Sequence, residues 1–160
     1  MKQSLANLLA GIALVGLAWS SSVQAKEESG NGHVAYQMLN SETFELPDGQ
    51  PAMRTHQRGT VLAEDESSSI HLSSQDCFGT MLLNADGSAA PGYGYCDGID
   101  RDGDMWTIWW KNETGEGSVW GYLGGTGKYV GVEGGGTTQN VLRSPDGRMV
   151  ITWKGKWTLK

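Results

Sequence analysis

The sequence of 160 residues predicts an all-β protein, built as a single closed antiparallel barrel of seven or eight strands. Three observations lead to this fold class. Residues 148–160 alternate between apolar and polar side chains, glycine-containing turn signals recur along the chain, and no segment after residue 25 has the pattern of an amphipathic helix. Closure into a barrel suits short strands joined by short turns, because it removes the exposed edges of an open sheet.

Residues 1–25 have the pattern of a secretory signal peptide. Lys2 supplies a positive charge, residues 8–19 are apolar or small, and Val23-Gln24-Ala25 forms a cleavage site. The apolar run is too short for a membrane span, and no cysteine follows it that could carry a lipid anchor. We expect cleavage after Ala25 and a mature protein in the periplasm or outside the cell.

The charge of the chain argues against two classes of partner. The formal net charge is −6, and it becomes −7 without Lys2, because 11 basic residues then stand against 18 acidic ones. An acidic surface repels phosphate backbones and anionic lipid headgroups. We therefore expect neither nucleic acid nor a membrane surface as a partner, and no membrane span after signal removal.

A single barrel domain is predicted at residues 33–160. It follows a flexible tail at residues 26–32, which is charged, rich in glycine and without large apolar side chains. Apolar residues then alternate with small or polar ones from residue 34 to residue 38, which indicates a first strand. We expect this strand to bend near Asn40-Ser41.

The next two strands are separated by an acidic link. A turn at Pro47-Asp48-Gly49 leads into a second strand at Met53–Ala63, whose polar residues indicate a solvent-facing side. Residues 64–69 are acidic or serine and form the link. The pattern of a third strand starts near Ile70.

Cys77 and Cys96 locate the centre of the sheet. They lie at equal distances in sequence from Asp86-Gly87, a dipeptide typical of two-residue hairpin turns. Such a turn places the two cysteines opposite each other, although Pro91 favours a bulge that would shift the register. In an oxidising compartment we expect them to form a disulfide; a catalytic thiol is the alternative.

Aspartates between residues 97 and 104 resemble part of a calcium-binding loop. The spacing within Asp100–Asp104 fits, but Gly98 stands where the first ligand would lie and Trp109 where the closing glutamate would lie. Asp102-Gly103 is also typical of a plain hairpin turn. We predict a turn with solvated carboxylates, with a weak cation site as the alternative.

The remaining strands are rich in tryptophan. Met105–Trp110 carries aromatic side chains on both faces, so both faces should be partly covered. Val119–Leu123 follows a turn that would bring Trp120 near Trp110, and Thr137–Leu142 forms a short strand. In the last strand one face holds lysines and the other faces a core. The residues of that inward face are Met149, Ile151, Trp153, Trp157 and Leu159.

A glycine-rich stretch at residues 124–136 separates two of these strands. A phosphate-binding Walker loop does not fit, because Tyr122 stands where its first glycine belongs and Tyr129 follows Lys128. No dinucleotide-binding pattern is present either, so we expect no cofactor. The glycines indicate a corner between two strands of a closed sheet. Within it Glu133 is interpreted as a solvated carboxylate, with contact to a ligand as the alternative.

The same stretch carries a resemblance to a known family. Residues 124–137 read Gly-Gly-Thr-Gly-Lys-Tyr-x-Gly-x-x-Gly-x-Gly-Thr. This run is similar to the late-strand signature of allene oxide cyclase and dirigent-like barrels, a group with secreted bacterial members of unassigned function. The resemblance covers the region from Cys77 to the C-terminus. It implies an eight-stranded antiparallel barrel, in some members with an apolar cavity, and no catalytic residue of the plant enzymes is carried over by position.

A ligand pocket is predicted among the aromatic residues of the second half of the chain. Each tryptophan buries up to about 250 Å², so most belong to the core, while two or three could line a cavity or stack on a sugar ring. Gly155 interrupts the inward row of the last strand and leaves a gap, which the corner at residues 124–136 would close at one end. The candidate pocket residues are Trp106, Trp110, Trp120, Tyr129, Trp153, Gly155 and Trp157.

No catalytic or metal-binding motif is recognised in the sequence. His33, His56 and His71 lack metal-ligand spacing, so no metal is predicted, and no Gly-x-Ser-x-Gly nucleophile elbow occurs. Catalytic residues, oligomeric state and the question of whether the protein is an enzyme stay open.

Three functions remain, and the interior of the barrel distinguishes them. A noncatalytic binder of a small apolar ligand comes first, and a roomy apolar cavity would favour it. A cyclase or isomerase acting on an apolar substrate rests on the resemblance, and a buried acid with a shifted pKa would favour it. A secreted structural module that contacts glycans through tryptophan is favoured by a filled interior.

Overall fold

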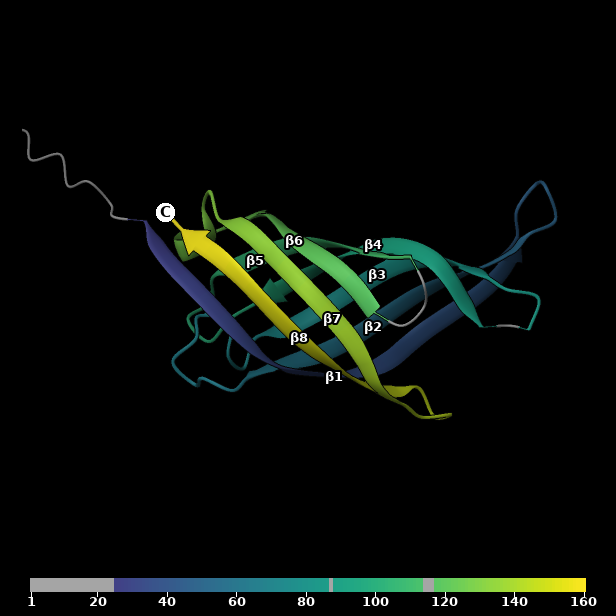
Figure 1. The fold of residues 1–160 in the computed structure, drawn as a ribbon, viewed down its shortest axis with the longest axis horizontal. Coiled ribbons are helices and arrows are strands. Elements are labelled where there is room, and N and C mark those ends of the chain that lie inside the picture. The colour runs from purple at the N-terminus through teal and green to yellow at the C-terminus, as the bar shows by residue number, and fades with distance from the viewer. Residues whose placement is uncertain (1–24, 87, 114–116) are drawn as a thin grey trace, which may run out of the picture.

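Eight antiparallel strands form a closed barrel in which every strand pairs with its neighbours in sequence and β8 pairs with β1 (Figure 1). The computed structural model describes residues 25–86, 88–113 and 117–160. The predicted fold class is confirmed. The strands are β1 (Lys26–Glu45), β2 (Pro51–Ala63), β3 (Ser74–Leu83), β4 (Ala89–Ile99), β5 (Met105–Asn112), β6 (Gly117–Gly125), β7 (Glu133–Arg143) and β8 (Arg148–Leu159), and a short 3₁₀ helix η1 spans Gly127–Tyr129.

The predicted signal peptide lies outside the described residues, apart from Ala25. The part of the chain that the structure describes holds no helix long and apolar enough to cross a membrane.

The start of β1 corrects the expected flexible tail at residues 26–32. These residues pair with the end of β8, from Lys26 opposite Leu159 to Gly32 opposite Trp153. The barrel therefore begins at residue 26 rather than 33, and the C-terminus lies beside the start of β1 in Figure 1. The segment lacks apolar side chains because a neighbouring strand supplies them: a β-carbon on Gly30 would lie only 3.2 Å from the Trp153 ring.

Bulges adjust the ladder at two predicted places. The register of β1 against β2 shifts between Met38 and Asn40, which confirms the expected bend. The register of β3 against β4 shifts between Met81 and Leu83, opposite Pro91, which lacks an amide proton for the ladder. The Asn84 amide donates to the Ser88 carbonyl, so the hairpin end does not follow the predicted two-residue geometry. The bulge offsets this difference in the length of the turn, so Cys77 still lies opposite Cys96 as expected.

The disulfide prediction is confirmed. Cys77 and Cys96 face each other across β3 and β4 with their α-carbons 4.0 Å apart, and their sulfurs are bonded at 2.06 Å. Both residues are buried and form part of the hydrophobic core. The bond lies on the inner surface of the barrel wall, where both cysteines line the interior cavity.

Strand β8 supplies a large share of the core, as its alternation predicts. Ile151, Trp153, Trp157 and Leu159 are buried and Met149 packs against them, while Lys154 and Lys156 are exposed. The other strands contribute fewer large side chains to the interior. The buried hydrophobic core from these strands and their loops is Val34, Val61, Ala63, Ile70, Cys77, Cys96, Trp106, Trp120, Tyr129 and Val132.

Tryptophan rings fill the space above inward-facing glycines of other strands. The indole of Trp106 covers Gly98, and the indole of Trp110 covers Gly79 and Gly94. Small and large residues thus alternate across the barrel wall, which lets a narrow barrel hold several indoles. Trp120 covers Gly155 in the same way, so the gap predicted at Gly155 is filled from inside by an indole ring, and Gly155 does not line the interior cavity.

The contact between Trp120 and Gly155 makes a prediction for Gly155→Ala. The added β-carbon would lie 2.5 Å from Cζ2 of Trp120 and 2.9 Å from the Gly135 carbonyl oxygen. We expect this overpacking to lower the free energy of unfolding by about 1–3 kcal/mol, as measured by urea denaturation. In a double-mutant cycle, combining it with Trp120→Leu should cost less than the sum of the two single changes. Simple additivity would contradict the contact.

One end of the barrel is closed by three loops, and we call it the closed end. The loops are residues 64–73, 100–104 and 126–132, and they insert Ile70, Tyr129 and Val132 into the core. Ile70 therefore belongs to a loop, and the third strand starts at Ser74 rather than near Ile70. The glycine-rich stretch is a corner between β6 and β7, as predicted, with glycines at positive φ at residues 124, 127, 131 and 134.

Candidate functional site

The interior of the barrel contains a cavity of about 130 Å³. An engineered cavity of about 150 Å³ lined by apolar side chains can bind benzene, so the space suits a ring or a short chain. The wall is mainly aromatic and aliphatic. Its apolar part consists of Val34, Val61, Ile70, Cys77, Met81, Cys96, Trp106, Ile108, Trp110, Trp120, Tyr122, Met149, Ile151 and Trp153.

Four of the seven predicted pocket residues line this cavity, and three do not. Trp106, Trp110, Trp120 and Trp153 form part of its wall. Trp157 and Tyr129 are buried in the closed end, and Gly155 lies beneath the Trp120 ring. The prediction placed Gly155 and Trp157 in the pocket because they belong to the inward row of the last strand, and Tyr129 because it belongs to the glycine-rich corner. At the closed end, however, packed aromatic rings fill the interior and leave no room for the cavity.

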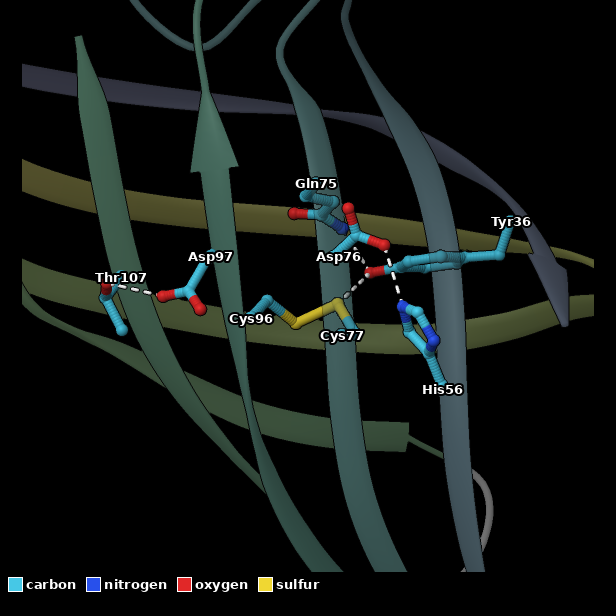
Figure 2. Close-up of a disulfide and its surroundings, with 8 residues drawn as sticks. All are labelled: Tyr36, His56, Gln75, Asp76, Cys77, Cys96, Asp97 and Thr107. Carbon is cyan, nitrogen blue, oxygen red and sulfur yellow. Dashed lines mark hydrogen bonds and ion pairs between the residues drawn. A yellow bond between two sulfur atoms is a disulfide. The ribbon is translucent and has the colours of Figure 1, made fainter. Parts of the chain in front are cut away.

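Tyr36 and Gln75 form a polar pair within the apolar wall (Figure 2). The Gln75 side-chain amide donates to the Tyr36 hydroxyl. The hydroxyl lies 3.4 Å from Sγ of Cys77 and donates to it, because a disulfide sulfur carries no proton. Burial raises the pKa of Tyr36, so this phenol stays protonated at neutral pH. It can orient a ligand but cannot act there as a base.

The end opposite the closed end is the mouth of the cavity. Here the β5–β6 and β7–β8 hairpins contribute polar side chains to the lining, and several of them are partly exposed. The apolar interior therefore leads towards a polar opening, an arrangement that suits a ligand with one polar end. The polar residues of the lining, apart from Tyr36 and Gln75, are Thr55, Gln57, Asn112, Ser118, Thr138, Asn140 and Arg143.

The charge of the lining differs from that of the whole protein. The chain is acidic, yet no aspartate, glutamate, histidine or lysine is among the described residues that line the cavity. Arg143 is the one charged side chain in that lining. A general acid or base that titrates near neutral pH is therefore missing from the described wall.

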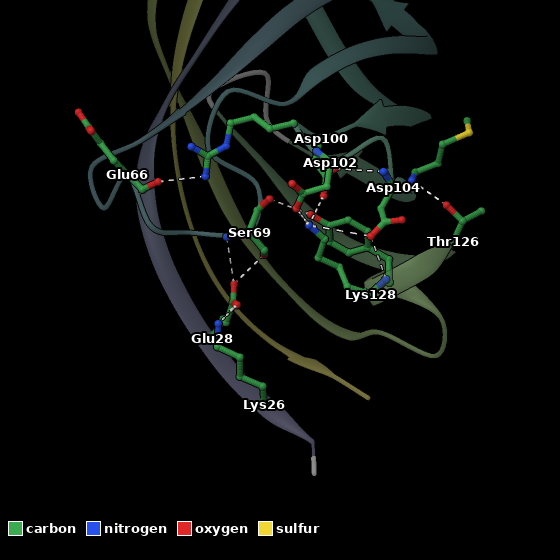
Figure 3. Close-up of polar contacts among 12 residues, drawn as sticks. Lys26, Glu28, Glu66, Ser69, Asp100, Asp102, Asp104, Thr126 and Lys128 are labelled. Atoms are coloured by element: carbon green, nitrogen blue, oxygen red, sulfur yellow. Dashed lines mark hydrogen bonds and ion pairs between the residues drawn. The ribbon is translucent and has the colours of Figure 1, made fainter. Parts of the chain in front are cut away.

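The aspartates of the turn near Arg101 pair with the ammonium group of Lys128 (Figure 3). Nζ of Lys128 lies 2.8 Å from Oδ2 of Asp100 and also pairs with Asp102. The carboxylate of Asp100 is only 1% exposed and accepts hydrogen bonds from the amides of Asp102 and Asp104. Asp102-Gly103 forms the predicted turn, but the carboxylates are not simply solvated as expected: the ammonium of Lys128 lies between them.

Asp100 and Glu28 have the most buried carboxylates of the closed end, and both are paired with other groups of the protein. Burial would raise the pKa of Asp100, but the hydrogen bond from Lys128 and those from two backbone amides outweigh it and lower the pKa. The carboxylate of Glu28 accepts from the Ser69 hydroxyl at 2.7 Å and from Lys26, and these bonds likewise outweigh burial and lower its pKa. No group of three or more acidic, histidine or cysteine side chains arranged for a metal occurs in the described residues.

Glu133 does not contact the cavity. It is exposed at the start of β7 and pairs with Lys160. This corresponds to the interpretation of Glu133 as a surface carboxylate, with a lysine partner added.

The outer face of β2 to β5 carries an exposed aromatic row. His56 stacks on Phe78 with ring centroids 4.3 Å apart, and the ladder places Phe78 beside Tyr95 and Tyr95 beside Trp109. His56 also contacts Asp76 (Figure 2), and the carboxylate of Asp76 accepts hydrogen bonds from Nε and Nη2 of Arg58 as well. These rings lie outside the barrel and are separate from the cavity.

The polar residues of the cavity were not among the predicted site residues. Tyr36 and Gln75 share the inward parity of Val34 and Cys77, so alternation along the strands could have placed them inside. Arg143 could not be found in this way, because a bulge between Asn140 and Leu142 changes the alternation of β7.

Solved structures with this architecture share the barrel but little sequence. The pterocarpan synthase dirigent protein GePTS1 matches with a TM-score of 0.53 and 12% identity, over 84% of this chain and 87% of that chain. The pterocarpan synthase dirigent protein PsPTS1 matches with a TM-score of 0.51 and 10% identity, over 86% and 96%. The chain has a dirigent-type barrel fold.

The dirigent-type barrel also resembles AbnU, an exo-specific intermolecular Diels-Alderase, with a TM-score of 0.47 and 13% identity over 83% of this chain and 98% of that chain. A scan against protein-family models and a search of curated proteins give no match. The barrel architecture implied by the resemblance of the glycine-rich run is confirmed by the fold.

Proposed function

We propose that this dirigent-type barrel binds a small, mainly apolar molecule in its cavity and holds it in one orientation, without catalysis by its own side chains. The observation that carries the proposal is the cavity of about 130 Å³, walled by indole rings, with the Tyr36–Gln75 pair on one side. Apolar walls supply affinity, and a few fixed polar groups supply orientation. The disulfide and the predicted signal peptide support action in the periplasm or outside the cell.

Acid–base catalysis has little support from the cavity. The buried carboxylate with the strongest claim, Asp100, lies in a turn of the closed end and is paired with Lys128. Tyr36 lines the cavity, but its raised pKa keeps it a hydrogen-bond donor. A cyclase or isomerase is the alternative, and it is supported by the fact that one protein of this fold is a pterocarpan synthase dirigent protein. Such an enzyme would have to act through shape, by holding a reactive substrate in a productive fold.

A cavity-filling variant tests the proposal. Toluene should bind the wild-type barrel and raise its melting temperature, because a ligand that binds the native state stabilises it. Ile108 lines the cavity, and Ile108→Trp should fill much of the space and reduce the affinity for toluene about tenfold or more. Tryptophan fluorescence and nuclear magnetic resonance titrations measure both affinities.

The matched control is Val119→Trp, which places the same side chain on the exposed surface of β6. It should bind toluene like the wild type. If the wild type binds neither toluene nor any copurifying small molecule seen in native mass spectra, the binding function is refuted. If Ile108→Trp binds as well as the wild type, the ligand lies elsewhere.

The exposed aromatic row supports a second candidate function. Phe78, Tyr95 and Trp109 lie side by side on adjacent strands and are exposed, an arrangement that suits stacking on the rings of a glycan. The Ile108→Trp variant separates the two candidates. Retention on an insoluble polysaccharide by both this variant and the wild type would favour the outer face.

A further inference from the structure

A β-bulge directs Arg143 towards the mouth of the cavity. Asn140 pairs with Ile151 and Leu142 pairs with Val150, so Val141 is an extra residue in β7. In a regular strand, residues two positions apart face the same side. Leu142 would then point inwards like Asn140, and Arg143 would point outwards. The bulge exchanges the two: Arg143 pairs with Met149, and both line the cavity.

This arrangement is unfavourable for the fold taken alone. Val141 is 60% exposed and Leu142 54% exposed, so the bulge leaves two aliphatic side chains in water. In exchange it brings a guanidinium to the opening of an apolar cavity. Bulges are frequent beside functional sites, where they change the direction of a side chain. The bulge therefore points to a role for Arg143 in ligand binding.

Arg143 has no acidic partner among the described residues, whereas Arg148 and Lys111 each have one. In the β7–β8 hairpin Arg148 pairs with Asp146 at 2.7 Å, and at the end of β5 Lys111 pairs with Glu113 at 2.7 Å. No described acid lines the cavity either. The guanidinium of Arg143 therefore presents several N–H donors at the mouth of the cavity, and no acidic side chain in the described part of the protein pairs with it.

We propose that Arg143 binds an anionic group of the ligand, so that the ligand is a small amphipathic anion with an apolar ring or short chain inside the barrel and a carboxylate-like group at the mouth. This inference rests on the proposed cavity-binding function and specifies its ligand class. The cavity of about 130 Å³ holds the apolar body, and the charged group stays near solvent, where its desolvation costs little.

A pair of probes that differ only in charge tests the inference. The probes are 3-phenylpropanoate and 3-phenylpropan-1-ol, which share an apolar body. The wild type should bind the carboxylate about tenfold more tightly than the alcohol, because a charge-assisted bond to arginine exceeds a neutral one. Dissociation constants come from tryptophan fluorescence titrations at constant ionic strength.

Three variants complete the experiment. Arg143→Gln should lose the preference for the carboxylate and keep its affinity for the alcohol, whereas Arg143→Lys should keep part of the preference. Arg148→Gln is the matched control, since Arg148 is exposed and already paired with Asp146, and it should behave like the wild type. Circular dichroism of each variant checks that it is folded.

The outcomes separate this inference from the function beneath it. Equal binding of both probes by the wild type, or a preference that survives Arg143→Gln in folded protein, overturns the anion inference and leaves the cavity-binding function standing. Binding of neither probe by a wild type that does bind toluene overturns the anion inference alone, whereas a wild type that binds neither the probes, nor toluene, nor a copurifying small molecule overturns both. Loss of alcohol binding in Arg143→Gln would mean that Arg143 shapes the mouth rather than binding the anion, and also overturns the inference.

Discussion

Removal of the disulfide in the Cys77→Ala/Cys96→Ala variant should lower the free energy of unfolding by about 3 kcal/mol. The bond joins residues separated by 19 positions and so restricts the unfolded chain considerably. The change also removes the sulfur that accepts the hydrogen bond of the buried Tyr36 hydroxyl, which adds to the loss. Urea denaturation of the oxidised wild type and of the variant measures the difference.

Reduction of the wild type supplies the control for this experiment. Reduced wild-type protein should lose nearly as much stability as the double variant, since both lack the cross-link. A loss below about 1 kcal/mol in both would show that the unfolded chain is not restricted by the bond as the chain-entropy argument requires.

Replacement of Lys128 by methionine should have a similarly large effect. Asp100 is almost fully buried, and Lys128→Met would leave its charge without the ammonium while two backbone amides still donate to it. A buried ion pair that loses one partner is strongly destabilised, so we expect a loss of about 3 kcal/mol. Lys111→Met removes the same side chain from an exposed pair with Glu113 and should cost less than about 1 kcal/mol.

The effect of Lys128→Met should depend on pH in a defined direction. Because the folded-state pKa of Asp100 is lowered, its ionised form stabilises the wild type above the unfolded pKa and this contribution is lost as pH falls through the folded pKa. The difference between wild type and Lys128→Met should therefore be largest near neutral pH and shrink below about pH 4. A difference that stays constant down to pH 2 would contradict the pairing. Denaturation at a series of pH values measures it.

The features that the sequence predicts correctly are those that depend on residues close together along one strand or one hairpin. Alternation in residues 148–159 indicates which side of β8 is buried, because a strand exposes successive residues to opposite faces. The symmetry of Cys77 and Cys96 about a turn predicts their pairing, even though the turn itself differs in length. Such signals depend only on neighbours along one strand or hairpin.

The features that sequence did not predict depend on contacts between distant strands. Glycines facing inward carry no apolar signal, so neither the pairing of residues 26–32 nor the filling of the space at Gly155 by Trp120 can be read from periodicity. The ion pair of Asp100 joins two loops 28 positions apart in sequence, 100 and 128, that meet only when the barrel closes. Arg143 was hidden by a bulge that reverses the alternation.

The seam between β1 and β8 has a consequence for the order of folding. These are the first and last strands of the barrel, and they pair over a dozen positions, from Lys26 with Leu159 to Gln37 with Arg148. Translation has to reach residue 159 before the barrel can close, and pairing between such distant segments slows folding. Until then β1 presents unpaired amides and carbonyls that can join a strand of another chain. We therefore expect folding to follow completion of the chain, with aggregation as the competing process while it is incomplete.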